Sequence, residues 1–214
     1  MEKSLYTSDL KKVAPPHLDD SRHFLEKDEN IVWQQFLGGD DQCLAYIYQK
    51  YVNVLYLYGQ QFSKRYEFVQ DCIQELFCEL IDKRKSLSAT KSLKAYLLVS
   101  LKRKILRGIK KDKQLQLDED RFKFISSDPP RSIHLHLKEN DYATIFAKIN
   151  ELPSSQREVI FLYFYEGMGY ADIAEIMNIK TATARTLTYR ALENLEQKLG
   201  PHISSFYCLL LLLP

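Results

Sequence analysis

The residues best suited to a specific chemical role lie on a helix expected from residue 181 onward. Their side chains suit the binding of nucleic acid rather than catalysis. Arg185 and Arg190 supply guanidinium groups, which donate paired hydrogen bonds to base edges or phosphates, and short hydroxyl side chains beside them suit the sugar-phosphate backbone. The set expected on one face is Thr181, Thr183, Arg185, Thr186, Tyr189 and Arg190. This pattern is typical of a helix that enters the major groove of DNA.

Residues 152–199 contain the elements that must position this face. The segment predicts three helices separated by two turns, with Gly167 and Gly169 ending the first helix and residues 170–177 forming a short second one. Ser154 or Ser155 is expected to cap the first of these helices, and Thr181 or Thr183 the third. A short helix, a tight turn and a second helix form a helix-turn-helix. The alternative is a small helical bundle whose polar face only meets solvent.

A second candidate surface is basic and lies on a helix expected over residues 93–111. Residues 91–113 contain nine basic residues and one acidic residue, although the whole chain carries a formal net charge of only +2. The basic and neighbouring side chains expected at the surface are Lys94, Tyr96, Ser100, Lys102, Arg103, Lys104, Arg107, Lys110 and Lys111. Cations interleaved with an aromatic side chain suit phosphate contact and base stacking. Any other polyanion would satisfy the charge alone.

A third surface is acidic. A helix expected over residues 67–85 places four carboxylates at intervals of four, Glu67, Asp71, Glu75 and Glu79, opposite an apolar face. Like charges at this spacing repel one another, so a basic partner would offset the cost. A solvated face is the alternative.

Composition points to an all-α protein. Glycine and proline are scarce, at seven residues each in 214, and no sustained alternation of polar and apolar residues predicts strands. The four cysteines and the His134–His136 pair lack the spacing of a metal site, so no metal or cofactor is expected, and the thiols fit buried positions in a reducing cytoplasm. We find no nucleophile motif, phosphate-binding loop or catalytic acid pair, and we predict no enzyme and no small-molecule substrate.

The order of these parts predicts two small helical domains joined by a flexible linker. We expect a disordered leader over residues 1–28, a first domain over 29–113, a linker over 114–136, a helix-turn-helix domain over 137–200 and an apolar tail over 201–214. The leader does not resemble a signal peptide, and the tail is too short to cross a bilayer, so no stable membrane insertion is expected.

Residues 30–199 resemble a bacterial extracytoplasmic-function sigma factor, a two-domain specificity subunit of RNA polymerase. Three passages carry the resemblance: VQDCIQELF at 69–77, the basic helix at 93–111, and the run from Glu151 to Ala191 that includes EGMGYADIA. The aromatic-rich sequence, with KAYLLVSLKRKIL and TYRAL, looks most like Bacteroidetes-type members.

The resemblance implies a division of roles. Asp71, Gln74 and Glu75 match positions that bind core RNA polymerase, the basic helix matches the region that melts and reads the minus-10 element, and the helix-turn-helix matches the region that binds the minus-35 element. The implied partners are core RNA polymerase, promoter DNA and an anti-sigma factor, and the implied location is cytoplasmic. The protein would direct polymerase to promoters without catalysing a reaction.

Two pairs of residues differ from the family pattern, and one alternative function remains open. Arg103 and Arg107 stand where the family commonly has Asn and Asp, and Leu187 and Thr188 stand where Arg and Leu are frequent. The rival is a stand-alone transcription regulator, which would bind DNA without polymerase.

Overall fold

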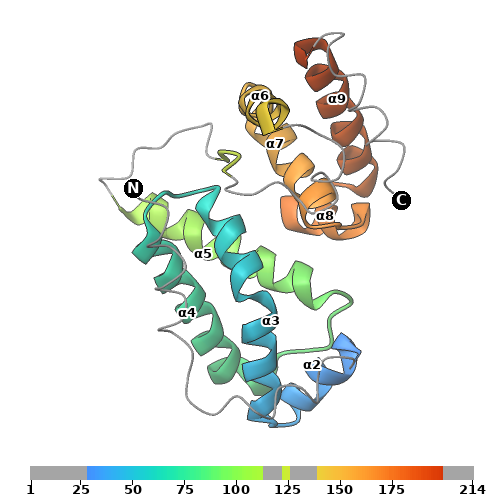
Figure 1. Ribbon diagram of the computed structural model, residues 1–214. Helices are drawn as coiled ribbons and strands as arrows, with labels where there is room; N and C mark the ends of the chain where they lie inside the picture. The colour runs from blue at the N-terminus through green and yellow to red at the C-terminus, as the bar shows by residue number, and fades with distance from the viewer. Residues whose placement is uncertain (1–27, 113–121, 126–138, 200–214) are drawn as a thin grey trace.

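The computed structural model describes residues 28–112, 122–125 and 139–199, and the helices in these ranges form two bundles (Figure 1). The N-terminal bundle contains α2 to α5, and the C-terminal bundle contains α6 to α9. Residues 1–27 of the predicted leader, the apolar tail with Cys208, and the His134–His136 pair lie outside the described residues. Within the described helices, none is both long and apolar enough to cross a membrane.

The N-terminal bundle follows the predicted pattern closely. Its elements are α2 (Glu29–Leu37), α3 (Asp41–Gln60), α4 (Tyr66–Lys83), the 3-10 turn η3 (Arg84–Ser86) and α5 (Leu93–Lys111). Three of these helices begin at side-chain caps: Asp28 accepts from the amide of Asn30, Asp40 from that of Gln42, and Ser92 from that of Ala95. The predicted apolar face of α4 is buried, so its acidic residues remain outside.

The C-terminal bundle contains the predicted helix-turn-helix. Its elements are α6 (Glu139–Asn150), α7 (Ser154–Ile160), the π-helical segment η4 (Phe161–Tyr165), α8 (Tyr170–Met177) and α9 (Thr181–Leu199). The backbone of Asn178 is left-handed, with φ of 55°, and this single residue ends α8 and turns the chain toward α9.

Two capping predictions differ from the structure. The residue before α7 is Pro153, and no side chain caps this helix. The Ser154 hydroxyl instead accepts a hydrogen bond from the amide of Phe122, so a tertiary contact uses the group that was expected to cap locally. Thr183 lies inside α9, which begins at Thr181.

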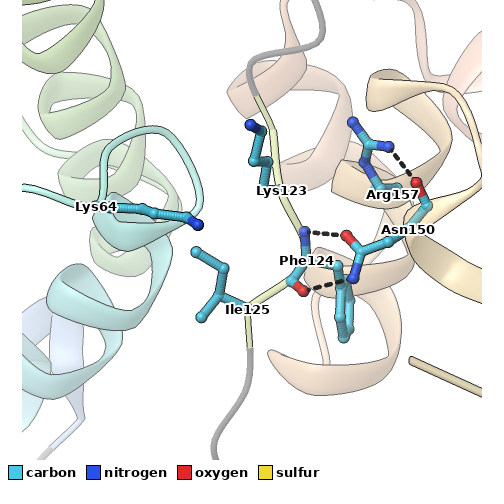
Figure 2. A pocket seen from close by; sticks show the side chains of 6 residues that line it. All are labelled: Lys64, Lys123, Phe124, Ile125, Asn150 and Arg157. Atoms are coloured by element: carbon cyan, nitrogen blue, oxygen red, sulfur yellow. Dashed lines mark hydrogen bonds between the residues drawn. The ribbon is translucent and has the colours of Figure 1, made fainter. Parts of the chain in front are cut away.

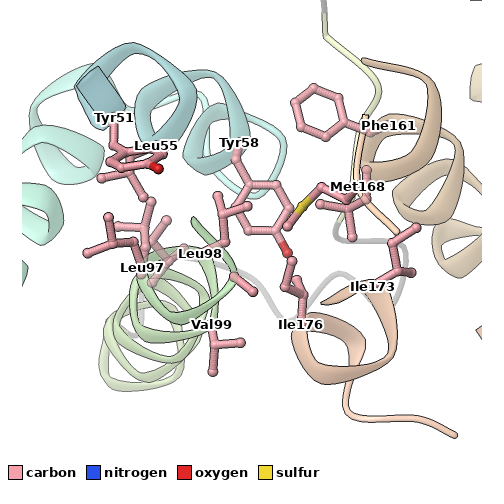
Figure 3. Packing of buried hydrophobic residues seen from close by; sticks show 14 of the residues in the cluster. Tyr51, Leu55, Tyr58, Leu97, Leu98, Val99, Phe161, Met168, Ile173 and Ile176 are labelled. Atoms are coloured by element: carbon pink, nitrogen blue, oxygen red, sulfur yellow. The ribbon is translucent and has the colours of Figure 1, made fainter. Parts of the chain in front are cut away.

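The two bundles are in direct contact, with α5 of the first against α8 of the second. Figure 3 shows the apolar part of this junction, where Tyr58 and Val99 of the N-terminal bundle face Phe161, Met168 and Ile176. All five side chains are at most 8% exposed. The junction therefore continues the core of each bundle.

A short segment of the predicted linker is part of this junction, and we call residues 122–125 the strap. Phe122 and Phe124 are 1% and 3% exposed. Within the predicted linker over residues 114–136, these four residues are therefore packed against the bundles, because burying two aromatic side chains stabilises the contact. The expected burial of every thiol fails, since Cys78 is exposed while Cys43 and Cys72 are buried.

Candidate nucleic-acid interface

The outer face of α9 presents the complete set of side chains expected to contact duplex DNA. The opposite face is anchored in the core by Ala184, Thr188, Ala191 and Leu195. The six exposed residues are Thr181, Thr183, Arg185, Thr186, Tyr189 and Arg190. Tyr189 is 63% exposed, an unusual position for a large aromatic side chain that has no contact role.

Arg185 is held over an aromatic ring from the preceding helix. Its guanidinium carbon lies 5.4 Å from the ring centre of Tyr170, and that ring stacks on Tyr163 with a 5.0 Å centroid distance. Burial, together with the hydrogen bond to Tyr163, raises the pKa of Tyr170 to about 12, so this phenol remains neutral. The cation–π contact therefore restricts where the guanidinium of Arg185 can point.

The basic side chains of α5 divide into groups that face different neighbours. The exposed group is Arg103, Arg107, Lys110 and Lys111. Lys104 instead turns toward α4, where its ammonium pairs with Glu79 and lies 3.6 Å from Glu75. Lys102 and Lys104 are two residues apart, which separates them by about 200° around a helix. The structure therefore does not place all the predicted minus-10 residues on one open face of α5.

The side chains of Tyr96 and Ser100 are half-buried. The Tyr96 ring packs 5.7 Å from that of Trp33, whose indole nitrogen donates to the carbonyl of Ser88. Tyr96 thus contributes to the junction of α2 and α5, and only part of its ring remains open for stacking.

The remaining two lysines of α5 reach the C-terminal bundle. Lys102 Nζ lies 2.6 Å from Glu158 Oε1, and Lys94 Nζ lies 2.7 Å from Glu166 Oε2 and 2.8 Å from the carbonyl of the same residue. The hydroxyl of Tyr58 donates to Glu158 at 2.6 Å. Burial and the nearby charge of Glu158 raise the pKa of Tyr58 well above its usual range, so Tyr58 stays a hydrogen-bond donor.

The predicted polymerase-binding residues share one open surface. Asp71, Gln74 and Glu75 are all exposed on α4, while the other side of the helix packs into the N-terminal bundle. The ammonium of Lys104 lies 3.6 Å from Glu75, so it offsets part of the negative charge that the acidic residues place on α4.

Sequence reasoning assigned no individual role to Arg157, which organises the strap. This side chain is 2% exposed, and it donates to the carbonyls of Phe122, Asn150 and Leu152 at 2.6 to 2.8 Å. Figure 2 shows it beside Asn150, which binds the backbone of Phe124 through both its oxygen and its nitrogen. Arg157 lies 35 residues from Phe122 in the sequence, so no local signal pointed to this contact.

A hollow of about 340 Å³ lies beside these contacts (Figure 2). Its lining includes Lys64, Lys123 and Ile125 together with the Arg157 and Asn150 side chains. Arg157 is engaged by backbone carbonyls and the two lysines are exposed. The hollow thus lies where the strap meets the two bundles. Among the described residues, no cluster of His, Cys, Asp or Glu is arranged to hold a metal ion.

Comparison with known proteins identifies both bundles. Residues 47–114 match the model for sigma-70 region 2, and residues 143–195 match the model for sigma-70 region 4; together the matches span more than half of the chain. The protein is also similar to the ECF RNA polymerase sigma factor SigM of Bacillus subtilis, with 24% identity over 151 residues, which is 70% of this chain and 91% of SigM. The chain belongs to the extracytoplasmic-function (ECF) sigma-70 family.

The chain is also similar to one further sigma factor and, in its fold, to one solved structure. The ECF RNA polymerase sigma-E factor of Haemophilus influenzae is 40% identical over 57 residues, covering 27% of this chain and 30% of that protein. The fold is similar to that of CnrH, solved in complex with the cytosolic domain of CnrY, with a TM-score of 0.56 and 18% identity over 80% of this chain and 97% of the other. The likeness to Bacteroidetes-type members is untested and stays a prediction.

Family membership decides between the two functions considered from the sequence. This sigma factor directs RNA polymerase to promoters and acts as a transcription initiation factor. The comparisons favour the sigma factor over a stand-alone regulator. The helix-turn-helix bundle matches sigma-70 region 4, and the N-terminal bundle also matches sigma-70 region 2. Core RNA polymerase and promoter DNA are therefore its partners.

Proposed function

We propose that the outer face of α9 binds the minus-35 element as duplex DNA. The observation that carries this assignment is that all six predicted contact residues are exposed on one helix of the region 4 match, with Arg185 already oriented by Tyr170. Arg185 and Arg190 bind base edges or phosphates, while Thr181, Thr183 and Thr186 approach the backbone. Tyr189 adds an apolar contact with the DNA at the edge of this face.

The basic side chains of α5 bind the non-template strand of an opened minus-10 element. The exposed cations Arg103, Arg107, Lys110 and Lys111 make the first electrostatic contacts with phosphates. Lys94 and Lys102 join them once they are released from the C-terminal bundle. Arg103 and Arg107 replace the Asn and Asp that are common in the family, so base preference here differs from the family pattern.

Asp71, Gln74 and Glu75 bind core RNA polymerase. This assignment rests on their exposure along one face of α4 and on the match of this helix to region 2. A basic or hydrogen-bonding surface on polymerase would offset the repulsion between carboxylates on this helix.

The chain divides into region 2 over residues 29–113, a linker over 114–136 and region 4 over 137–200, flanked by a leader and an apolar tail. An anti-sigma factor masks the DNA-binding and polymerase-binding surfaces. The protein works in the cytoplasm, where the chromosome and polymerase are, and it needs no cofactor and catalyses no reaction of its own.

A pull-down with core RNA polymerase tests the polymerase assignment. The double variant Asp71→Lys with Glu75→Lys reverses two charges, and we expect binding to core polymerase to fall at least tenfold, on the order of 1.4 kcal/mol or more. The matched control reverses Glu193 and Glu196, which are exposed on α9. Equal binding by both double variants would refute the assignment of α4.

A further inference from the structure

The only tryptophan of the chain lies against a side chain that was expected to bind single-stranded DNA. Trp33 is on α2, is 2% exposed, and has its ring centre 5.7 Å from that of Tyr96 on α5. Tyr96 is half-buried, so part of its ring packs on Trp33 and part stays at the surface. An aromatic ring at the surface of a basic helix is a platform on which an unpaired base can stack.

The indole of Trp33 is fixed by a hydrogen bond as well as by packing. Its nitrogen donates to the carbonyl of Ser88 at 3.0 Å, in the segment that leads from η3 into α5. The ring of Phe36, also on α2, packs 5.2 Å from the indole. A tryptophan whose buried N–H group is paired keeps the plane of its ring, because rotation would break the hydrogen bond. The surface against which Tyr96 packs is therefore rigid.

Helix α2 is itself anchored to the rest of the bundle. Asp28 caps the helix, and Glu29 in its first turn forms a 2.6 Å ion pair with Lys50 of α3. Helix α2 also contacts η3 and α5, and Figure 1 shows it near the segment that enters α5. The match to sigma-70 region 2 begins at residue 47, so it does not include α2 or Trp33.

We propose that Trp33 is a positioning residue, which holds the Tyr96 ring in the orientation that stacks on an unpaired base of the opened minus-10 element. This proposal rests on the proposed DNA-binding role of α5. A surface tyrosine without such support samples several rotamers, and fixing one of them on binding costs free energy. The contact with Trp33 removes part of that cost before DNA binds. Trp33 does not touch DNA itself, because its side chain is buried.

The test compares binding of single-stranded DNA by the full-length protein and its variants. Trp33→Leu removes the supporting ring, Trp33→Phe keeps a ring but removes the donor to Ser88, and Tyr96→Leu removes the stacking ring. Phe77→Leu is the matched control, because it removes a buried ring that packs on Tyr48 in the same bundle. Fluorescence anisotropy with a labelled 20-mer of mixed sequence reports affinity, and chemical denaturation monitored by circular dichroism reports stability.

We expect a graded loss of affinity that does not follow stability. Tyr96→Leu should weaken binding about tenfold, as the loss of one stacked base does. Trp33→Leu should weaken it about fivefold and Trp33→Phe about twofold, while Phe77→Leu should bind normally although it is less stable. The double variant with leucine at positions 33 and 96 should bind no worse than Tyr96→Leu alone, because Trp33 acts through Tyr96.

The outcomes separate the positioning role from the DNA-binding role. Additive losses in the double variant, or an equal loss of affinity in Phe77→Leu, would overturn the positioning role. If Arg103→Ala weakens binding and Trp33→Leu does not, the positioning role falls and the DNA-binding role of α5 stands. If neither Arg103→Ala nor Tyr96→Leu weakens binding, the assignment of α5 to single-stranded DNA is wrong. Should Trp33→Leu lose its helices, Trp33→Phe decides, and wild-type affinity in that variant would count against the proposal.

Discussion

At the scale of single residues, Arg185 shows how a neighbouring helix prepares a DNA contact. Arginine side chains lose rotamer freedom when they bind, and a guanidinium already held over a ring loses less. The stack of Tyr163, Tyr170 and Arg185 joins η4, α8 and α9 at the point where the two helices of the helix-turn-helix meet. The position of Arg185 is thus set by aromatic residues that do not themselves lie on the outer face of α9.

The first prediction concerns this stack. Arg185→Ala should weaken binding to a promoter duplex by about 1–3 kcal/mol and relax the preference for at least one base pair. Tyr170→Leu should weaken binding by only about 0.5–1 kcal/mol, because Arg185 remains but is no longer oriented, while Tyr170→Phe should bind normally. Anisotropy with a duplex that the holoenzyme transcribes in vitro measures all three variants. An unchanged promoter preference after Arg185→Ala would refute base contact by that side chain.

At the scale of elements, close helix contacts in the N-terminal bundle fix the orientation of α5. Gly59 of α3 allows the approach, since a Cβ atom there would lie 2.6 Å from Val69 of α4 and 3.2 Å from Ile105 of α5. Gly108 plays the same part on α5 beside Phe68. These contacts determine which basic side chains of α5 point outward and which turn toward α4.

The second prediction concerns this packing. Gly59→Ala should lower the free energy of unfolding by about 1–3 kcal/mol, because the clash with two packed side chains exceeds the gain in helix propensity. Gly169→Ala is the control, since a Cβ atom there meets no heavy atom within 4 Å and its φ of −71° suits any residue. Chemical denaturation monitored by circular dichroism compares the two. A Gly59→Ala protein as stable as the wild type would contradict the close approach.

At the scale of the whole molecule, the strap lies between the two bundles and contacts both of them. The ring of Phe122 contacts those of Phe62 and Phe161, with centroids 5.3 and 5.8 Å away, so it touches both bundles at once. Its carbonyl accepts from Arg157 and its amide donates to Ser154, which secures it to the C-terminal side.

The third prediction follows from this shared contact. Removing the ring by Phe122→Ala should destabilise the junction by about 3–5 kcal/mol and uncouple the bundles, so that one calorimetric transition becomes two. Phe77→Ala is the matched control, because Phe77 packs against Tyr48 within the N-terminal bundle and its loss weakens that bundle alone. A single transition in the Phe122→Ala protein would show that the strap is not needed for coupling.

The sequence by itself determined the helices and the outer face of α9. Residues 93–111 and 170–177 were predicted with the bounds that the structure gives, because the period of apolar residues and the nearby caps are local signals. The exposure of Arg185 and Tyr189 follows in the same way from the burial of Ala184 and Ala191 on the opposite side of one helix. A helical period places side chains around an axis and needs no knowledge of distant segments.

Only the tertiary structure decided what each charged side chain meets. Lys102 and Lys104 look alike in the sequence, yet one pairs with Glu158, 56 residues away, and the other with Glu79 of the neighbouring helix. The tertiary structure likewise decided that Phe122 is buried, although it lies in a segment predicted as linker. Such pairings depend on how two bundles pack against each other, and no local period encodes that choice, because the free energy comes from contacts between segments far apart in the chain.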